Sequence, residues 1–328
     1  MKALVTGGGG FLGRYIVEKL LAAGADVQTL SRNPQPELIA MGVKTFCGDV
    51  GESDEVMKAT AGVDTVFHVA AKVGIGGNHR EFHQTNVVGT RNVINACRAQ
   101  GARKLVFTSS PSVVFDGKPH EGIDETYPYP AKHTAFYPMT KAIAEREVLE
   151  ANGPGLLTCS LRPHLVWGPR DTNLIPRLLA RAKAGRLRIV GDGANLIDTV
   201  YVENAADAHL LAAQRLETGS KVAGSAYFIS QGEPVNCWEF VNRILEKLGG
   251  KPVTKHIPYP VAYTIGGALE FIYGVLGRND EPPMTRFLAQ QLAMPHYFNI
   301  TKAREELGYT PLVNTEEGLE RLAKTFQA

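Results

Sequence analysis

The chain has 328 residues, 44% of them hydrophobic, which is enough to bury the core of one large domain or of one and a half. Its 35 basic and 33 acidic side chains nearly balance, which argues against a nucleic-acid-binding protein and against a disordered tail. Four cysteines without CxxC spacing or nearby histidines argue against disulfides and zinc, and predict buried thiols in a cytoplasmic protein: Cys47, Cys97, Cys159 and Cys237.

Strand and helix patterns alternate from the N-terminus onward. The first strand starts at once, which leaves no room for a signal peptide. Gly24 and Gly101 stand where two of the helices would end with a glycine cap. The alternation predicts right-handed βαβ units and an α/β fold with a Rossmann-type, doubly wound parallel sheet. The expected strands are KALVTG, DVQTLSR, VKTFCGD, DTVFHVA and KLVFTSS.

The alternation loosens near residue 170, where proline, glycine and arginine become more frequent. We therefore expect a Rossmann domain over residues 1–170 and a smaller, mainly substrate-binding part over residues 171–328. Residues 226–230 and 237–249 would belong to the smaller part, whereas residues 198–202 are a candidate for return to the main body.

The segment 260–277 is the most apolar stretch of the chain. Glu270 and several glycines interrupt it, and it is short for a membrane span, which needs about 20 apolar residues. It predicts a buried or interfacial helix, and it is the candidate for peripheral membrane or enzyme-complex association.

A glycine-rich turn, VTGGGGFLG, follows the first strand and opens the first helix at Phe11. Gly7 would allow the tight turn, Gly10 would let the backbone approach a pyrophosphate, and Gly13 would let the helix pack closely on the sheet. The phosphates would lie at the positive end of that helix. This context predicts dinucleotide binding.

The end of the second strand indicates which dinucleotide is bound. An acid there would hold a ribose 2′-hydroxyl, whereas an arginine would accommodate a 2′-phosphate. The chain has Ser31 and Arg32 at this point, with no carboxylate before Glu37. A guanidinium suits a phosphate, so we expect NADP(H); the alternative is an exposed surface arginine.

Two tyrosine–lysine pairs have the same four-residue spacing, Tyr137 with Lys141 and Tyr15 with Lys19. Either pair would lie on one face of a helix. The pair of Tyr15 belongs to the helix directly behind the glycine turn, so we expect it to be structural. The pair of Tyr137 follows a strand that ends in Ser110, which favours catalysis over an aromatic core residue.

Ketone reduction needs a hydride on carbon and a proton on oxygen. A phenol with a pKa near 10 is a slow acid–base group at neutral pH, and a neighbouring ammonium lowers that pKa. Lys141 would supply this charge to Tyr137. Ser110 would hydrogen-bond the carbonyl oxygen at the carboxyl end of its strand, where ligands of such sheets bind.

Other candidate residues fit plainer roles. His68, His83 and His164 lack metal-ligand spacing, so we expect packing or pocket lining and no metal. A basic run predicts mainly a solvated helix face, from which one or two side chains could meet an anionic substrate group: Arg170, Arg177, Arg181, Lys183, Arg186 and Arg188.

The chain resembles the extended short-chain dehydrogenase/reductase family along nearly its whole length. The resemblance is carried by TGGGGFLG, GDV, HVAAK, NVVGT, TSSPSVV, YPMTK, LRPHLVWGP and FNITKAREELGYTP. It implies a catalytic set of Ser110, Tyr137, Lys141 and Asn86, with Ser112 as the alternative serine and Asn86 in a helix behind the site. It also implies that the following residues bind the cofactor: Gly7, Gly10, Phe11, Leu12, Gly13, Ser31, Arg32, Asp49, Val50, Ala70, Ala71, Lys72, Tyr137, Lys141, Pro163 and Val166.

Within this family, EPPMTR and the closing residues resemble 3β-hydroxysteroid and sterol-4-carboxylate dehydrogenases, and still more the bacterial enzymes that reduce 2-alkyl-3-oxoalkanoates in olefin synthesis. The resemblance implies NADPH-dependent reduction of a hydrophobic β-keto acid, with Arg170 or Lys72 near its carboxylate. It also implies a homodimer through helices at 79–100 and 134–152. The alternatives are a sterol dehydrogenase, a nucleotide-sugar epimerase and a non-catalytic NADP(H) sensor.

Overall fold

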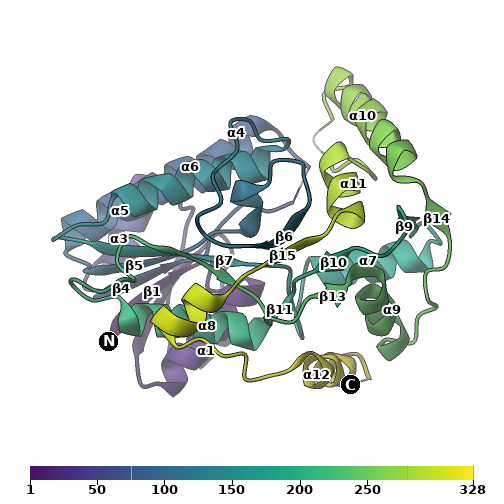
Figure 1. Ribbon diagram of the computed structural model, residues 1–328. Helices are drawn as coiled ribbons and strands as arrows, with labels where there is room; N and C mark the ends of the chain where they lie inside the picture. The colour runs from purple at the N-terminus through teal and green to yellow at the C-terminus, as the bar shows by residue number, and fades with distance from the viewer. Residues whose placement is uncertain (75, 279, 328) are drawn as a thin grey trace.

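A seven-stranded parallel sheet forms the centre of the computed structural model, which describes residues 1–74, 76–278 and 280–327 (Figure 1). The predicted Rossmann-type sheet is confirmed, with its strand order reversing between the first and fourth strands. In spatial order the strands are β12 (Ala226–Ile229), β7 (Leu157–Pro163), β5 (Lys104–Thr108), β4 (Thr65–His68), β1 (Lys2–Thr6), β2 (Asp26–Ser31) and β3 (Lys44–Cys47).

Helices cover both faces of this sheet (Figure 1). On the first strand Val5 faces one hydrophobic cluster and Leu4 faces the other, because successive side chains of a strand point to opposite faces. Both residues are fully buried, as expected for a parallel sheet. One face carries α1 (Phe11–Ala22) and α8 (Val202–Arg215), and the other carries α3 (Ser53–Thr60), α5 (Gly89–Gln100) and α6 (Phe136–Glu150).

Short elements complete the Rossmann body. Gly24 and Gly101 follow α1 and α5 with φ angles of 74° and 76°, so the predicted glycine caps are confirmed. The helix expected before Gly101 is interrupted by a π-helical turn. The remaining elements are α2 (Pro36–Ala40), α4 (His79–Phe82), the π-helical turn η1 (His83–Val88) and the 3₁₀ turn η2 (Pro111–Val114).

The smaller part lies beyond the carboxyl ends of the main strands (Figure 1). It contains three small sheets, with spatial orders β13-β10-β15-β6, β11-β8 and β14-β9. Their strands are β6 (His120–Ile123), β8 (Val166–Trp167), β9 (Ile189–Val190), β10 (Leu196–Ile197), β11 (Val200–Tyr201), β13 (Val235–Asn236), β14 (His256–Ile257) and β15 (His296–Phe298). Its helices are α7 (Leu174–Lys183), α9 (Cys237–Lys247), α10 (Tyr259–Val275), α11 (Arg286–Ala293) and α12 (Thr315–Gln327). The π-helical turn η3 (Ala303–Leu307) instead packs against α8 and β12 of the main body.

Some elements after residue 170 return to the main body. The helix α8 packs against α1, and β12 pairs with β7 at the edge of the seven-stranded sheet. Residues 226–230, which we had expected in the smaller part, therefore lie mostly in the main sheet. A short apolar run alone does not indicate which sheet a strand will join, because its pairing with another strand depends on distant residues.

The segment 260–277 forms most of α10, the helix that stands beside α11 at the upper right of Figure 1. Large apolar side chains remain exposed along it: Val261, Ile265, Phe271, Ile272, Val275 and Leu276. Among the described residues, no helix has the length and apolar character needed to cross a membrane. Association of this segment with a membrane surface or another enzyme stays a prediction.

Candidate active site

A large cavity of about 1340 Å³ opens at the carboxyl ends of the main strands. Its cofactor side is lined by the glycine turn and by residues that follow β2, β4 and β5. It continues between α7, α9, α10 and α11 of the smaller part. Ligands of open α/β sheets bind at this edge, beside the point where the strand order reverses.

The glycine turn has the geometry that its spacing predicts. Gly7 has a φ of 71°, and a side chain there would meet the Ala70 backbone at 3.0 Å. A Cβ atom on Gly13 would lie only 2.2 Å from the Gly7 carbonyl oxygen, so the helix can pack here only with glycine. Gly10 donates to the Gly7 carbonyl at 2.8 Å and begins α1 without a side-chain cap. The first amides of α1 are therefore available to an anion.

Residues after β2 and β3 form the far end of the cofactor side. Ser31 and Arg32 line the cavity, and the Ser31 hydroxyl accepts a hydrogen bond from Gly9 N at 3.4 Å. Arg32 is exposed, and no other described side chain forms an ion pair with it. Asp49 and Val50 line the same end of the cavity. Their predicted contacts with the cofactor stay predictions.

The loop after β4 contains three of the predicted cofactor-binding residues, Ala70, Ala71 and Lys72, and they do not all face the cavity. Ala70 and Ala71 line the cavity. Lys72 is not one of the described residues that line it, and its ammonium lies 2.9 Å from the Glu81 carboxylate. The Asn86 amide accepts from Lys72 N at 2.8 Å and donates to Lys72 O at 3.0 Å. Asn86 is buried in η1 behind the site, so the structure gives it a loop-holding role.

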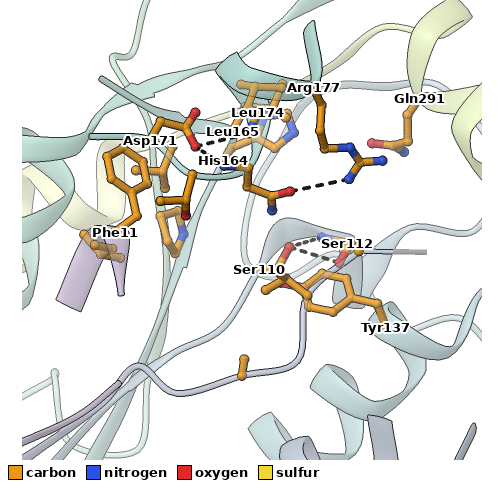
Figure 2. Close-up of a pocket in the computed structure, with 18 of the residues that line it drawn as sticks. Phe11, Ser110, Ser112, Tyr137, His164, Leu165, Asp171, Leu174, Arg177 and Gln291 are labelled. Atoms are coloured by element: carbon orange, nitrogen blue, oxygen red, sulfur yellow. Dashed lines mark hydrogen bonds between the residues drawn. The ribbon is translucent and has the colours of Figure 1, made fainter. Parts of the chain in front are cut away.

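Three hydroxyl groups meet at the centre of the cavity, from Tyr137, Ser110 and Ser112 (Figure 2). The two serine oxygens lie 3.0 Å apart, and Ser110 Oγ also accepts from Ser112 N at 3.2 Å. Burial raises the pKa of Tyr137, and hydrogen bonding from Ser110 opposes that shift. Both serines therefore remain candidates for contact with a carbonyl oxygen, as the sequence had left open.

Lys141 lies one helical turn after Tyr137, with its side chain almost fully buried. Its ammonium donates to the Thr108 carbonyl at 2.6 Å and lies 3.9 Å from the centre of the Phe107 ring. Burial lowers the pKa of Lys141 to about 7, while the carboxylate of Glu145 opposes this shift. The group can therefore change its charge near neutral pH.

Beneath Lys141 lies a buried ion pair that sequence reasoning missed. Arg162 donates to Glu145 at 2.7 Å, and Tyr129 and Ser160 each donate to the same carboxylate at 2.7 Å. Burial alone would raise the pKa of Glu145, but Arg162 holds it below its ordinary value. Glu145 is one turn after Lys141 on the face that packs on the sheet, which was the only signal available in the sequence.

The chain turns sharply after β7, and this turn lines the cavity. Pro163 and Val166 both lie there, as do His164 and Leu165 between them. Leu165 has a φ of 43°, a left-handed backbone conformation that is uncommon for a leucine and that often occurs at functional sites. The contacts of Pro163 and Val166 with a nicotinamide stay predictions.

The second tyrosine–lysine pair is structural, as predicted. Tyr15 is buried and donates to the Pro169 carbonyl at 3.0 Å, while Lys19 pairs with Asp207 at 2.8 Å. Arg170 lies over the Tyr15 ring and binds both carboxylate oxygens of Glu18, at 2.6 and 2.8 Å. This pairing turns Arg170 away from the cavity, so our expectation that Arg170 or Lys72 would meet a substrate carboxylate finds no support in their positions.

We had expected the basic run to form mainly a solvated helix face, from which one or two side chains could meet an anionic group. Four of its arginines line the cavity: Arg177, Arg181, Arg186 and Arg188. Arg177 and Arg181 lie on α7, and Figure 2 shows Arg177 beside Gln291, across the cavity from Tyr137 and Ser112. Apolar residues surround this part of the cavity: Val241, Ile265, Leu269, Met284, Phe287 and Leu288.

Fold and site together define a Rossmann-type oxidoreductase of the extended short-chain dehydrogenase/reductase class. Comparison with known proteins agrees, since residues 4–260 match the 3-beta hydroxysteroid dehydrogenase/isomerase family. The protein belongs to this family, which confirms the resemblance seen in its motifs.

Two curated relatives span nearly the whole chain. The 2-alkyl-3-oxoalkanoate reductase of Stenotrophomonas maltophilia (strain K279a) is 49% identical, and the match covers 100% of both chains. The sterol-4-alpha-carboxylate 3-dehydrogenase, decarboxylating, of Mus musculus is 37% identical, over 99% of this chain and 91% of the mouse protein. Among solved structures, MoeE5 in complex with UDP-glucose and NAD has a TM-score of 0.78 and 25% identity, covering 100% of this chain and 99% of MoeE5.

Proposed function

We propose that the protein is an NADP(H)-dependent reductase that converts the 3-oxo group of a hydrophobic 2-alkyl-3-oxoalkanoate to the 3-hydroxy acid. The observation that carries this proposal is the convergence of Tyr137, Ser110 and Ser112 where the cofactor side of the cavity meets an apolar chamber. An apolar wall favours an alkyl chain, since each buried methylene contributes about 0.8 kcal/mol. The full-length similarity to a reductase of this name supports the same substrate class.

In the proposed reaction, the nicotinamide supplies a hydride to the carbonyl carbon when NADPH is bound. Tyr137 donates its phenolic proton to the carbonyl oxygen, and Ser110 stabilises the negative charge that develops on that oxygen. The Lys141 ammonium favours the resulting phenolate. In the reverse direction the same phenolate removes the proton of the hydroxyl group.

The proposed cofactor contacts follow the cavity from one end to the other. The pyrophosphate would lie on the amides that begin α1, and Arg32 would hold the 2′-phosphate. Pro163 and Val166 would lie beside the nicotinamide, opposite Tyr137. The other proposed contacts are Gly7, Gly10, Phe11, Leu12, Gly13, Ser31, Asp49, Val50, Ala70, Ala71 and Lys141.

A substrate panel tests this function directly. We expect purified protein to oxidise long-chain 2-alkyl-3-hydroxy acids with NADP⁺, with kcat/KM rising steeply with alkyl length. Formation of NADPH measures the rate. The panel should also contain a 3β-hydroxysterol 4-carboxylate and a UDP-sugar. Turnover of the sterol alone would favour the sterol dehydrogenase, and turnover of the UDP-sugar alone would show that the proposed substrate class is wrong.

The cofactor preference gives a second test. We expect Arg32→Asp to weaken NADPH binding by about 10- to 100-fold, because a phosphate contact from a charged group contributes about 1.5–3 kcal/mol. NADH binding should change much less, so the preference should move toward NADH. Titration of both cofactors measures this by fluorescence. Lys58→Asp makes the same charge change on an exposed residue of α3, outside the cavity, and should change neither affinity. Tighter binding of NADH than NADPH by the unaltered protein would contradict the assignment.

A further inference from the structure

The wall of the apolar chamber contains more positive than negative charge. Arg177 and Arg181 lie one turn apart on α7, so their side chains share one face of the helix, and both line the cavity. The carboxylate of Glu281 pairs with Arg177. Asp171 also lines the cavity, but its oxygens accept from three backbone amides at the start of α7, at 2.7, 3.1 and 3.0 Å.

Arg181 has no anionic partner of its own within the described parts of the chain. Its guanidinium is only partly exposed, and burial lowers its pKa, with the neighbouring charge of Arg177 as the next cause. Arg186 and Arg188 line the cavity as well, so the four guanidinium groups outnumber the carboxylates of Asp171 and Glu281 beside them. A partly buried charge without a partner is costly, so this wall favours an anionic ligand.

The position of Arg177 relative to the hydroxyl groups restricts which anion fits. Its guanidinium is oriented by Asn173 Oδ1 at 3.4 Å and faces Ser112 and Tyr137 across the cavity (Figure 2). Ser112 Oγ lies 3.0 Å from Ser110 Oγ. In a β-keto acid, the ketone carbon and the carboxylate carbon share one neighbouring carbon, so a carboxylate oxygen lies close to the ketone oxygen. Two adjacent serine hydroxyls match these two adjacent oxygens.

We propose that Arg177 and Ser112 bind the carboxylate of the substrate, while Ser110 and Tyr137 hold its ketone oxygen. The bound carboxylate then offsets part of the excess positive charge of the cavity wall. This inference rests on the proposed function and names the residues that select an acid over a neutral ketone. Arg177 and Ser112 thereby determine the specificity of the reaction.

The test compares a long-chain 2-alkyl-3-hydroxy acid with its methyl ester, using NADP⁺ and measuring kcat/KM for each. The unaltered protein should prefer the acid. Arg177→Gln should lower kcat/KM for the acid by about 10- to 100-fold, since hydrogen bonds to charged groups have this strength, and should leave the ester within a few-fold. Ser112→Ala should lower the acid rate less. Glu281→Gln removes the competing carboxylate and should raise the preference for the acid.

Controls separate this role from a structural one. Lys183→Gln removes one positive charge from the same helix at an exposed residue that does not line the cavity, and should leave the acid-to-ester ratio unchanged. NADPH affinity, measured for each variant, shows whether the fold is retained. Arg177→Lys keeps the charge and should restore part of the preference.

Three outcomes would overturn the inference. Equal loss of acid and ester turnover in Arg177→Gln, with NADPH binding retained, would mean that Arg177 only supports the fold of the site. Equal rates for acid and ester in the unaltered protein would remove the carboxylate site and leave the reductase function standing. Turnover of neither compound would remove the proposed function and the site with it.

Discussion

Tyr137→Phe is expected to lower kcat by about 10²–10⁴-fold, the usual contribution of a general acid or base. Phenylalanine fills the same volume and removes only the hydroxyl that meets Ser110 and Ser112 in the cavity. Burial already raises the pKa of Tyr137, and hydrogen bonding from Ser110 opposes that shift. Oxidation of a 2-alkyl-3-hydroxy acid with NADP⁺ measures the loss.

Tyr15→Phe is the matched control for this substitution. Tyr15 has the same four-residue spacing to a lysine, but its hydroxyl donates to the Pro169 carbonyl outside the cavity. Its loss should leave turnover nearly unchanged. NADPH binding should survive in both variants. Equal losses of turnover from the two substitutions would contradict the assignment of Tyr137 as the proton donor.

Glu145→Ala is expected to lower the free energy of unfolding by about 3–5 kcal/mol, the usual cost of leaving one member of a buried ion pair without its partner. Arg162 is almost fully buried and donates to Glu145 through two of its nitrogens, at 2.7 and 3.1 Å. Removal of the carboxylate also leaves Tyr129 and Ser160 without their acceptor. Urea unfolding followed by circular dichroism measures the change.

Two further variants test this explanation. Glu147 lies on the same helix and pairs with the exposed Arg91, so Glu147→Ala should cost no more than about 1 kcal/mol. The double change of Glu145→Leu with Arg162→Met removes both buried charges and should recover much of the lost stability. A double variant as unstable as Glu145→Ala would show that packing, and not the unpaired charge, causes the loss.

Much of the Rossmann body could be predicted because its signals are local. The glycine spacing of Gly7, Gly10 and Gly13 specifies a backbone shape, and the spacing of Tyr137 and Lys141 specifies one face of a helix. Alternating short apolar runs and helical patterns indicate a parallel sheet, whichever side chains fill it.

The residues that the sequence did not predict depend on distant partners. Arg170 and Arg177 occur in one basic run, but Arg170 precedes α7 with a φ of 65° and binds Glu18 on α1. Arg177 lies inside α7 and faces the cavity. Glu145 and Arg162 are 17 residues apart and meet only because α6 packs on β7. Composition and spacing contain no signal for such pairings.

The uncapped start of α1 means that a bound dinucleotide would also stabilise the fold. Gly10 precedes the helix as its N-cap and offers no side-chain acceptor for the first amides, and the first turn reads Phe-Leu-Gly-Arg, with no carboxylate. A dinucleotide pyrophosphate would supply the missing acceptors, so the ligand would complete the helix as well as serve the reaction. Ligand at 100 times its Kd adds about 2.7 kcal/mol to the stability of the folded state. Degradation in cells acts mainly on unfolded chains, so the lifetime of this protein should lengthen as the pool of its dinucleotide rises.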